Sequence, residues 1–162
     1  GLVGADGYHA IAANRARYAE RYGWDEARIT HLLERYGAQI EDLGALIDTD
    51  SSLGAPLAKA PQFLRADVVF AVRYEGALHL EDVLVRRVRL DLEQRDRGLA
   101  AADEILEILR SELGWDDQKV KEERDLYAAR VQAIREAEST STDAEASAKI
   151  EAVPAVDPRI KL

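Results

Sequence analysis

The sequence predicts a single all-α domain, a compact bundle of about seven helices followed by an irregular C-terminal tail. Apolar residues recur at the helical spacing of three or four along most of the chain. The length of 162 residues suits one domain, and a composition of 47% apolar and 33% charged residues is that of an ordinary globular protein. We expect the helical domain to cover residues 1–137 and the tail residues 138–162.

The overall composition argues against several classes of protein. The 22 Lys and Arg against 31 Asp and Glu give a net charge of −9, which is unlike a general nucleic-acid binder, because such proteins neutralise phosphates. The absence of Cys excludes disulfides and Cys-ligated zinc sites. No apolar run approaches the roughly 20 residues of a transmembrane segment, and no secretory signal is visible. Because the chain contains no Met, we expect it to be a domain taken from a longer protein.

Three helices are expected in the N-terminal third, over about residues 8–22, 25–36 and 38–47. The first two are followed by Gly23 and Gly37, where a left-handed residue would end a helix. Gly44 lies inside the third and weakens it by about 1 kcal/mol relative to Ala, unless a neighbour packs closely against it.

The next part of the chain contains a loop and an ambiguous apolar run. Residues 48–62 are expected to form a loop, because they are rich in Asp, Ser, Gly and Pro. Residues 68–72 form a short apolar run that fits either a strand or a buried helix. We favour a helix over residues 65–74, since this segment has no helix breaker and no second strand is evident to pair with it.

Three further helices are expected, over about residues 80–92, 99–113 and 117–137. The sequence Gly23-Trp24-Asp25 recurs as Gly114-Trp115-Asp116. In both copies Gly can end one helix, Asp can cap the next, and Trp can pack on the first turn of that helix. We therefore interpret both Trp residues as structural corners between helices rather than as ligand platforms.

The composition shifts beyond Glu138. Ser and Thr, then Ala, then Pro154 and Pro158 dominate this part of the chain. Such a composition is typical of a tail that cannot pack a core of its own.

No catalytic, metal-binding or cofactor-binding constellation is visible in the sequence. His9, His31 and His79 lack the i, i+4 spacing of a helical zinc pair. The three Gly within the first seven residues do not have the spacing of the dinucleotide-binding motif, and no Gly-x-Ser-x-Gly nucleophile elbow is present. We therefore assign no catalytic, cofactor or metal residue to this chain.

The most distinctive local feature is a cluster of arginines, Arg86, Arg87, Arg89, Arg95 and Arg97. Acidic residues are interleaved with them, and Asp82 and Arg86 form an i, i+4 pair on one helix face. Adjacent helical residues point about 100° apart, so Arg86 and Arg87 should face different partners, one within the domain and one across an interface. This pattern favours salt bridges or interdomain docking, with direct phosphate binding as the alternative.

Residues 64–98, LRADVVFAVRYEGALHLEDVLVRRVRLDLEQRDRG, carry two short patterns. They resemble the C-terminal domain of FAD-dependent glycerol-3-phosphate dehydrogenases, the aerobic, quinone-linked enzymes. That family usually has Ala-Glu-Val-x-Tyr-Ala-Val-x-His-Glu followed by Glu-Asp-Val-Leu-x-Arg-Arg-Thr. The chain matches these patterns at Ala66, Val68, Ala71, Val72, Glu75, Glu81, Asp82, Val83, Leu84, Arg86 and Arg87.

The resemblance extends over about residues 1–137, through the segments GLVGADGYHAIAANRARYAERYG, HLLERYGAQIEDL and ILRSELGWDDQKV. Two positions depart from the family. Tyr74 stands where the family usually has His, and Val88 stands where it usually has Thr. Both substitutions fit a segment that is structural rather than catalytic.

The resemblance implies an activity for a longer parent protein. The parent would oxidise glycerol 3-phosphate to dihydroxyacetone phosphate through FAD and pass electrons to a quinone, in the cytoplasm and peripheral to the inner face of a membrane. A homo-oligomeric parent is compatible with the resemblance. FAD and substrate are expected to bind to upstream domains, so this chain alone should bind no cofactor and be inactive.

The implied role of the chain is a helical cap that docks on those upstream FAD and substrate domains. Glu75, Asp82, Arg86 and Arg87 are the residues expected to fix and dock the segment. The competing interpretation is a stand-alone helical protein-interaction module. A domain taken from a larger body should expose an apolar patch of more than a few hundred Å² where the body was removed.

Overall fold

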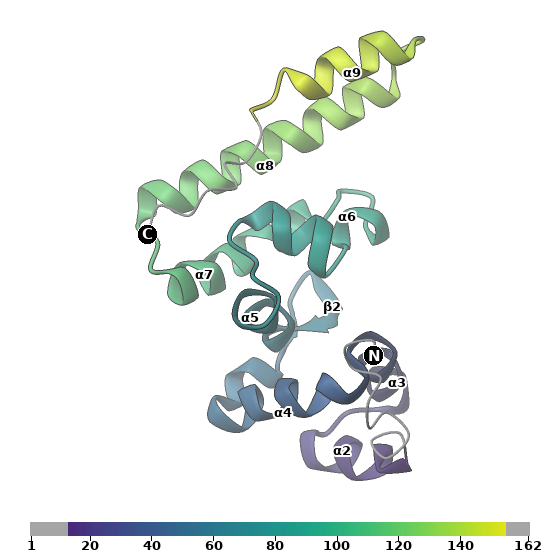
Figure 1. Ribbon diagram of the computed structural model, residues 1–162, viewed down its shortest axis with the longest axis vertical. Coiled ribbons are helices and arrows are strands. Elements are labelled where there is room, and N and C mark those ends of the chain that lie inside the picture. Colours follow the sequence, from purple (N-terminus) through teal and green to yellow (C-terminus); the bar gives the residue numbers. More distant parts are fainter. Residues whose placement is uncertain (1–12, 155–162) are drawn as a thin grey trace.

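The helical spacing of the apolar residues is realised along nearly the whole chain in the computed structural model, which describes residues 13–154 (Figure 1). Eight α-helices lie within these described residues, and the predicted all-α class is confirmed. Their bounds are α2 (Arg15–Tyr22), α3 (Glu26–Tyr36), α4 (Ile40–Thr49), α5 (Arg65–Arg73), α6 (Leu90–Glu93), α7 (Ala102–Leu113), α8 (Asp117–Glu138) and α9 (Asp143–Glu151). Shorter turns of 3₁₀ helix are η1 (Gly37–Gln39), η2 (Ser51–Gly54) and η4 (Leu99–Ala101), and η3 (Asp82–Arg87) is a π-helix.

The glycine and aspartate roles in both predicted Gly-Trp-Asp corners are confirmed. Gly23 and Gly114 each end a helix in the left-handed conformation, with φ of 67° at both positions. The Asp25 side chain then accepts the Arg28 backbone N–H at 2.7 Å, and Asp116 accepts the Lys119 N–H at 2.8 Å. The caps satisfy backbone donors that would otherwise be free at the start of α3 and α8. Residues 8–12 of the predicted helix over residues 8–22 lie outside the described residues.

Gly44 has the close neighbour that could justify a glycine inside α4. A Cβ atom at this position would stand 2.5 Å from the Tyr22 hydroxyl oxygen. Tyr22 in turn stacks on Trp24, with ring centroids 4.6 Å apart. The glycine therefore lets α2 approach α4.

The prediction of a loop over residues 48–62 is wrong. α4 continues to Thr49, η2 follows, and β1 (Pro56–Leu57) and β2 (Ala60–Leu64) form an antiparallel hairpin. The hairpin forms because its apolar side chains reach the core: Leu57, Ala60, Phe63 and Leu64 are all buried. The helix favoured over residues 65–74 is confirmed as α5, which is also largely buried.

The single helix predicted over residues 80–92 is also wrong, because the chain forms η3 and then the one-turn α6. Arg89 separates them in the left-handed conformation, with φ of 59°. A straight α-helix would point Leu90 about 200° away from Val88. The wide turn and the left-handed residue rotate the chain so that both side chains are buried.

The elements stack along the long axis of the molecule (Figure 1). α2, α3 and α4 form one end, α5 and the hairpin lie in the middle, and α8 and α9 form the other end. α5 packs against both α4 and α7, and α7 packs against α8. Within the described residues, no helix is both long and apolar enough to cross a membrane.

The prediction of an irregular tail from residue 138 onward is wrong for residues 143–151. They form α9, which packs alongside α8, with the Thr142 hydroxyl accepting the Glu145 N–H at 3.3 Å as the N-terminal cap. Ala133 and Ala137 of α8 are buried, although no residue of α9 is itself buried. An ion pair of 3.7 Å between Lys149 of α9 and Glu136 of α8 also joins the two helices. Residues 155–162 of the predicted tail lie outside the described part of the chain.

Candidate functional site

The structure brings the four predicted docking residues together in the turn between α5 and α6. Glu75 follows α5, while Asp82, Arg86 and Arg87 lie on η3. The Asp82 carboxylate accepts the backbone N–H groups of Leu78 at 3.0 Å and of His79 at 3.1 Å, and it pairs with Arg86 four residues later. The predicted i, i+4 pair is confirmed, and it fixes the start of η3.

Arg86 also reaches a carboxylate that links this turn to α8. Its guanidinium lies 3.2 Å from Glu81, whose side chain is 5% exposed. The other carboxylate oxygen of Glu81 lies 3.3 Å from Nε of Arg130 on α8. Glu81 is therefore held between two arginines, as a buried carboxylate requires.

Arg87 faces a different partner from Arg86, as their adjacent helical positions predict. Its Nη2 donates to the backbone carbonyl of Glu75 at 2.7 Å and its Nε donates at 3.2 Å, while the Glu75 carboxylate lies 3.8 Å away. Arg35 of α3 donates to the carbonyl of Arg87 at 2.8 Å. Both arginines thus have partners within the chain, and a contact across an interface stays a prediction.

The buried carboxylate of Asp67 lies beside Arg35, the arginine that donates to the Arg87 carbonyl. Asp67 is fully buried and accepts the Tyr36 hydroxyl and the Leu64 backbone N–H, the latter at 2.6 Å, with Nε of Arg35 at 3.7 Å. Burial raises the pKa of Asp67 above its ordinary value, although the hydrogen bonds from Tyr36 and Leu64 and the charge of Arg35 oppose the rise. Sequence reasoning missed this residue; its signal was an acid in the first turn of an otherwise apolar helix.

A second buried carboxylate, Glu123, joins α8 to the same turn. It accepts hydrogen bonds from Lys119 at 2.7 Å, from the Leu80 backbone N–H at 3.0 Å and from Nδ1 of His79 at 2.8 Å. Burial alone would raise its pKa, but these hydrogen bonds outweigh it and hold the pKa of Glu123 below the ordinary value. Sequence reasoning missed Glu123 too, although it occupies a position of the apolar stripe through Val120 and Tyr127.

The histidines and the two positions that depart from the family pattern are structural in this fold. The His31 ring packs edge-on against Phe63, with centroids 5.5 Å apart, and His79 contacts Glu123. Tyr74 stacks on a core phenylalanine, and Val88 is buried. The described residues hold no group of side chains suited to a metal ion, and His9 lies outside them.

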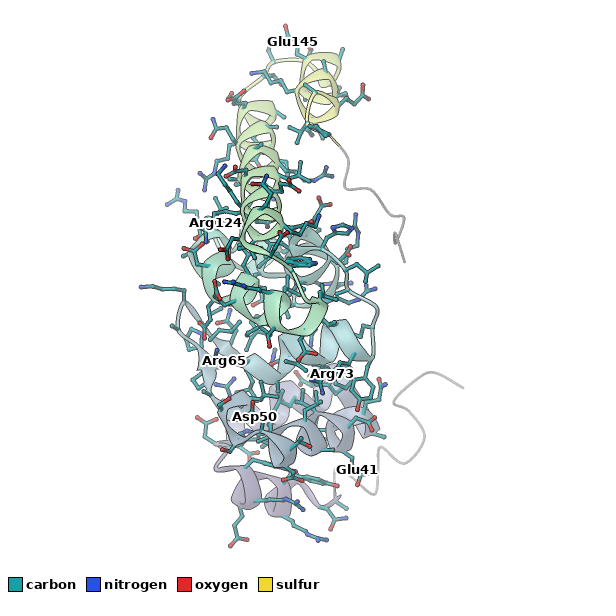
Figure 2. All side chains as sticks on the ribbon, turned by 90° about the vertical axis from the view of Figure 1, so that its left-hand side faces the viewer. Glu41, Asp50, Arg65, Arg73, Arg124 and Glu145 are labelled. Atoms are coloured by element: carbon teal, nitrogen blue, oxygen red, sulfur yellow. The ribbon has the colours of Figure 1, made fainter. Side chains whose placement is uncertain are left out.

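A hollow of about 220 Å³ lies between α4, α5 and α7 on the described surface. Figure 2 shows Asp50, Arg65 and Arg73, which line it, on one face of the molecule. Arg73 is already paired with Glu112 through two hydrogen bonds of 2.6 and 2.8 Å. Charges of both signs line the hollow, and no nucleophile, base and orienting group converge in it.

The predicted large apolar patch stays a prediction for this chain. There, the exposed large apolar side chains are Tyr74, which is 49% exposed, and Leu92, which is 75% exposed. Large apolar side chains that are strongly exposed are thus few on the described surface.

Comparisons with known proteins identify the relatives of this fold. The family model described as the C-terminal domain of alpha-glycerophosphate oxidase matches residues 1–120. A glycerol-3-phosphate dehydrogenase of Mycobacterium leprae is 42% identical over 133 residues, which are 82% of this chain and 23% of the relative. Glycerol-3-phosphate dehydrogenase 2 of Mycobacterium tuberculosis is 40% identical over 132 residues, again 82% of this chain and 23% of the relative.

More distant relatives extend beyond the mycobacteria. The mitochondrial glycerol-3-phosphate dehydrogenase SDP6 of Arabidopsis thaliana is 31% identical over 134 residues, 75% of this chain and 21% of the relative. No solved structure matches the chain. The chain spans less than a quarter of the length of these curated relatives.

Proposed function

Since the chain belongs to the family of the C-terminal domain of alpha-glycerophosphate oxidase, we propose that it is the non-catalytic helical domain of a glycerol-3-phosphate dehydrogenase. The observation that carries this proposal is the identity of 40–42% to mycobacterial glycerol-3-phosphate dehydrogenases over 82% of the chain. More than three quarters of the Mycobacterium leprae relative lies outside the matched region. The chemistry is therefore assigned to that larger part, which we call the catalytic body.

In this proposal the whole protein oxidises sn-glycerol 3-phosphate to dihydroxyacetone phosphate and reduces a quinone at the cytoplasmic face of a membrane. FAD would accept the electrons from the substrate, and the catalytic body would bind it. The described residues of this chain do not fit FAD, because a dinucleotide site needs a Gly-rich turn between a parallel strand and a helix. The strands described are those of one antiparallel hairpin.

The domain's own task is to present a fixed surface to the catalytic body. We name residues 74–98 the docking segment. Its first half is held by the pairs of Arg86 with Asp82 and of Arg87 with Glu75, and α8 holds it through Glu123. These contacts keep the segment in one conformation, which lowers the entropy cost of docking.

Activity measurements on the whole protein and on the isolated 162-residue chain test this proposal. The whole protein should reduce an artificial electron acceptor when glycerol 3-phosphate is added, and it should show the visible absorption of a flavin. The isolated chain should do neither. A whole protein that does not oxidise glycerol 3-phosphate would refute the proposed function, and activity in the isolated chain would refute the assignment of catalysis to the body.

A further inference from the structure

The second half of the docking segment carries an exposed leucine between two arginines whose side chains have no partner. Leu92 on α6 is 75% exposed, more than any other large apolar side chain described. Arg89 and Arg95 lie three residues before and after it, and both are exposed. Across residues 13–154 neither of these two arginine side chains has a hydrogen bond or an ion pair, although the Arg89 backbone carbonyl accepts the Leu92 N–H at 3.1 Å. We call Arg89, Leu92 and Arg95 the Leu92 tip.

Two hydrogen bonds join the hairpin to the residues that directly follow Leu92. Glu93 accepts a hydrogen bond from the Gln62 side chain at 3.1 Å, and the Gln94 side chain donates to the Lys59 carbonyl at 2.9 Å. α6 lies at the edge of the molecule in Figure 1. The tip therefore lies at the edge of the molecule beside residues that are hydrogen-bonded to the hairpin.

The backbone around the tip is also kept in a costly conformation. Arg89 and Arg97 are non-glycine residues with φ of 59° and 58°, and each such residue costs on the order of 1 kcal/mol. Leu90 on the inner side of α6 is fully buried, and Gly98 packs against it so closely that a Cβ atom would stand 3.1 Å away. Core packing of Leu90 thus fixes the turn that leaves Leu92 outside.

We propose that the Leu92 tip is the point at which the catalytic body of the same polypeptide contacts this domain. The body would offer an apolar hollow to Leu92 and carboxylates to Arg89 and Arg95. This inference rests on the proposed function and names the residues through which the domain docks. An apolar contact surrounded by a rim of polar and charged groups is the usual anatomy of a protein interface.

The small size of the tip favours a tethered partner over a second copy of the chain. A stable dimer buries roughly 800 Å² on each partner, which one leucine and two arginines do not provide. A tethered body has an effective concentration on the order of millimolar, so a small and polar contact suffices. Such a body is expected, because the matched region is only 23% of the length of the mycobacterial relatives.

A photocrosslinking experiment on the whole protein tests the proposal. The photoreactive amino acid p-benzoylphenylalanine replaces Leu92, and in a control variant it replaces Arg135, which is exposed on α8 outside the docking segment. After irradiation, digestion and mass spectrometry locate the crosslinked peptides. We expect Leu92 to crosslink to a peptide of the catalytic body within the same polypeptide, and Arg135 not to do so.

Several outcomes would overturn the proposal. They are crosslinks from position 92 to a second copy of the protein, crosslinks to added lipid vesicles, and a yield no higher than that of the Arg135 control. Charge reversal gives an independent readout from the same crosslinking position. The substitutions Arg89→Glu and Arg95→Glu together should lower the crosslinking yield by about tenfold, whereas Arg135→Glu should leave it unchanged. Equal yields in the two variants would also contradict the proposal.

The same preparations separate this inference from the proposed function. A protein that oxidises glycerol 3-phosphate but gives no crosslink from position 92 to its body retains the proposed function and refutes the role of the tip. A protein that gives the crosslink but does not oxidise glycerol 3-phosphate refutes the proposed function and retains the interdomain contact.

Discussion

Replacing Glu123 with Gln should destabilise the domain strongly, although the two side chains have nearly the same shape. Glu123 is 3% exposed and accepts hydrogen bonds from Lys119, His79 and the Leu80 backbone. The substitution removes the charge that faces these donors and turns an acceptor into an amide group that itself donates. The contact between α8 and the docking segment would be weakened at its centre.

The size of the effect follows from the partners of this carboxylate. A hydrogen bond to a charged group contributes about 1.5–3 kcal/mol, but Gln keeps one acceptor oxygen and such contributions are not additive. Lys119 is 38% exposed and can turn to water when its partner is lost. We therefore expect Glu123→Gln to lower the free energy of unfolding by about 2–3 kcal/mol at pH 7.

The effect should shrink in acid, and its sign follows from the pKa. Hydrogen bonds hold the pKa of Glu123 in the folded protein below the ordinary value of 4.5. The unfolded state therefore binds more protons near this pH. The stabilisation by the carboxylate is complete above about pH 4.5 and is lost as the pH falls through the folded-state pKa. The difference between the wild type and Glu123→Gln should accordingly decrease as the pH falls.

Urea unfolding of the chain, followed by far-ultraviolet circular dichroism, measures this difference. With a slope of about 2 kcal/mol per molar urea, the midpoint should move by about 1–1.5 M at pH 7. Asp125→Asn is the matched control on the same helix, because Asp125 is 60% exposed and pairs with the exposed Lys121. It should change the stability by less than about 1 kcal/mol. Equal effects of the two substitutions, or an effect of Glu123→Gln that does not depend on pH, would refute the reasoning.

Two other predictions concern the docking segment. Arg87→Ala should lower the free energy of unfolding by about 1–3 kcal/mol, because it leaves the half-buried backbone carbonyl of Glu75 without its donor. The same substitution should leave the KM of the whole protein for glycerol 3-phosphate unchanged. Arg86→Ala should lower the free energy of unfolding by less in the same urea assay, because the Arg86 side chain is 50% exposed. Unchanged stability of Arg87→Ala would contradict the structural role of Arg87. Gly98→Ala should be more destabilising than Gly76→Ala, since both glycines have positive φ but only at Gly98 would a Cβ atom stand 2.9 Å from Leu84. A calorimetric melting temperature that falls equally in both would show that the tight packing at Gly98 is unimportant.

The helical corners were predictable because their signals are local. A glycine at the end of one helix and an aspartate before the next are sufficient to define each corner, as Gly114 and Asp116 show. The hairpin was not predictable in the same way. β1 has two residues and β2 contains Pro61, so neither strand has the alternating pattern that indicates a strand. Its formation depends on burial against α5, which is information from the tertiary structure.

The candidate site was predictable only in part. The pair of Asp82 and Arg86 followed from the i, i+4 spacing. The partner of Arg87 is a backbone carbonyl, and the role of Glu123 depends on how α8 crosses a segment more than 30 residues earlier in the chain. The break at Arg89, which leaves Leu92 exposed, arises from the burial of Leu90 and has no local sequence signal such as glycine.

Hydrogen–deuterium exchange in the whole protein and in the isolated chain tests the central claim most directly, namely that this domain docks on a catalytic body through residues 74–98. Peptides from this segment should exchange more slowly in the whole protein, because docking covers them, while peptides from α9 should exchange equally in both. Equal exchange of the docking segment in the two proteins, or slowing confined to other helices, would contradict the account.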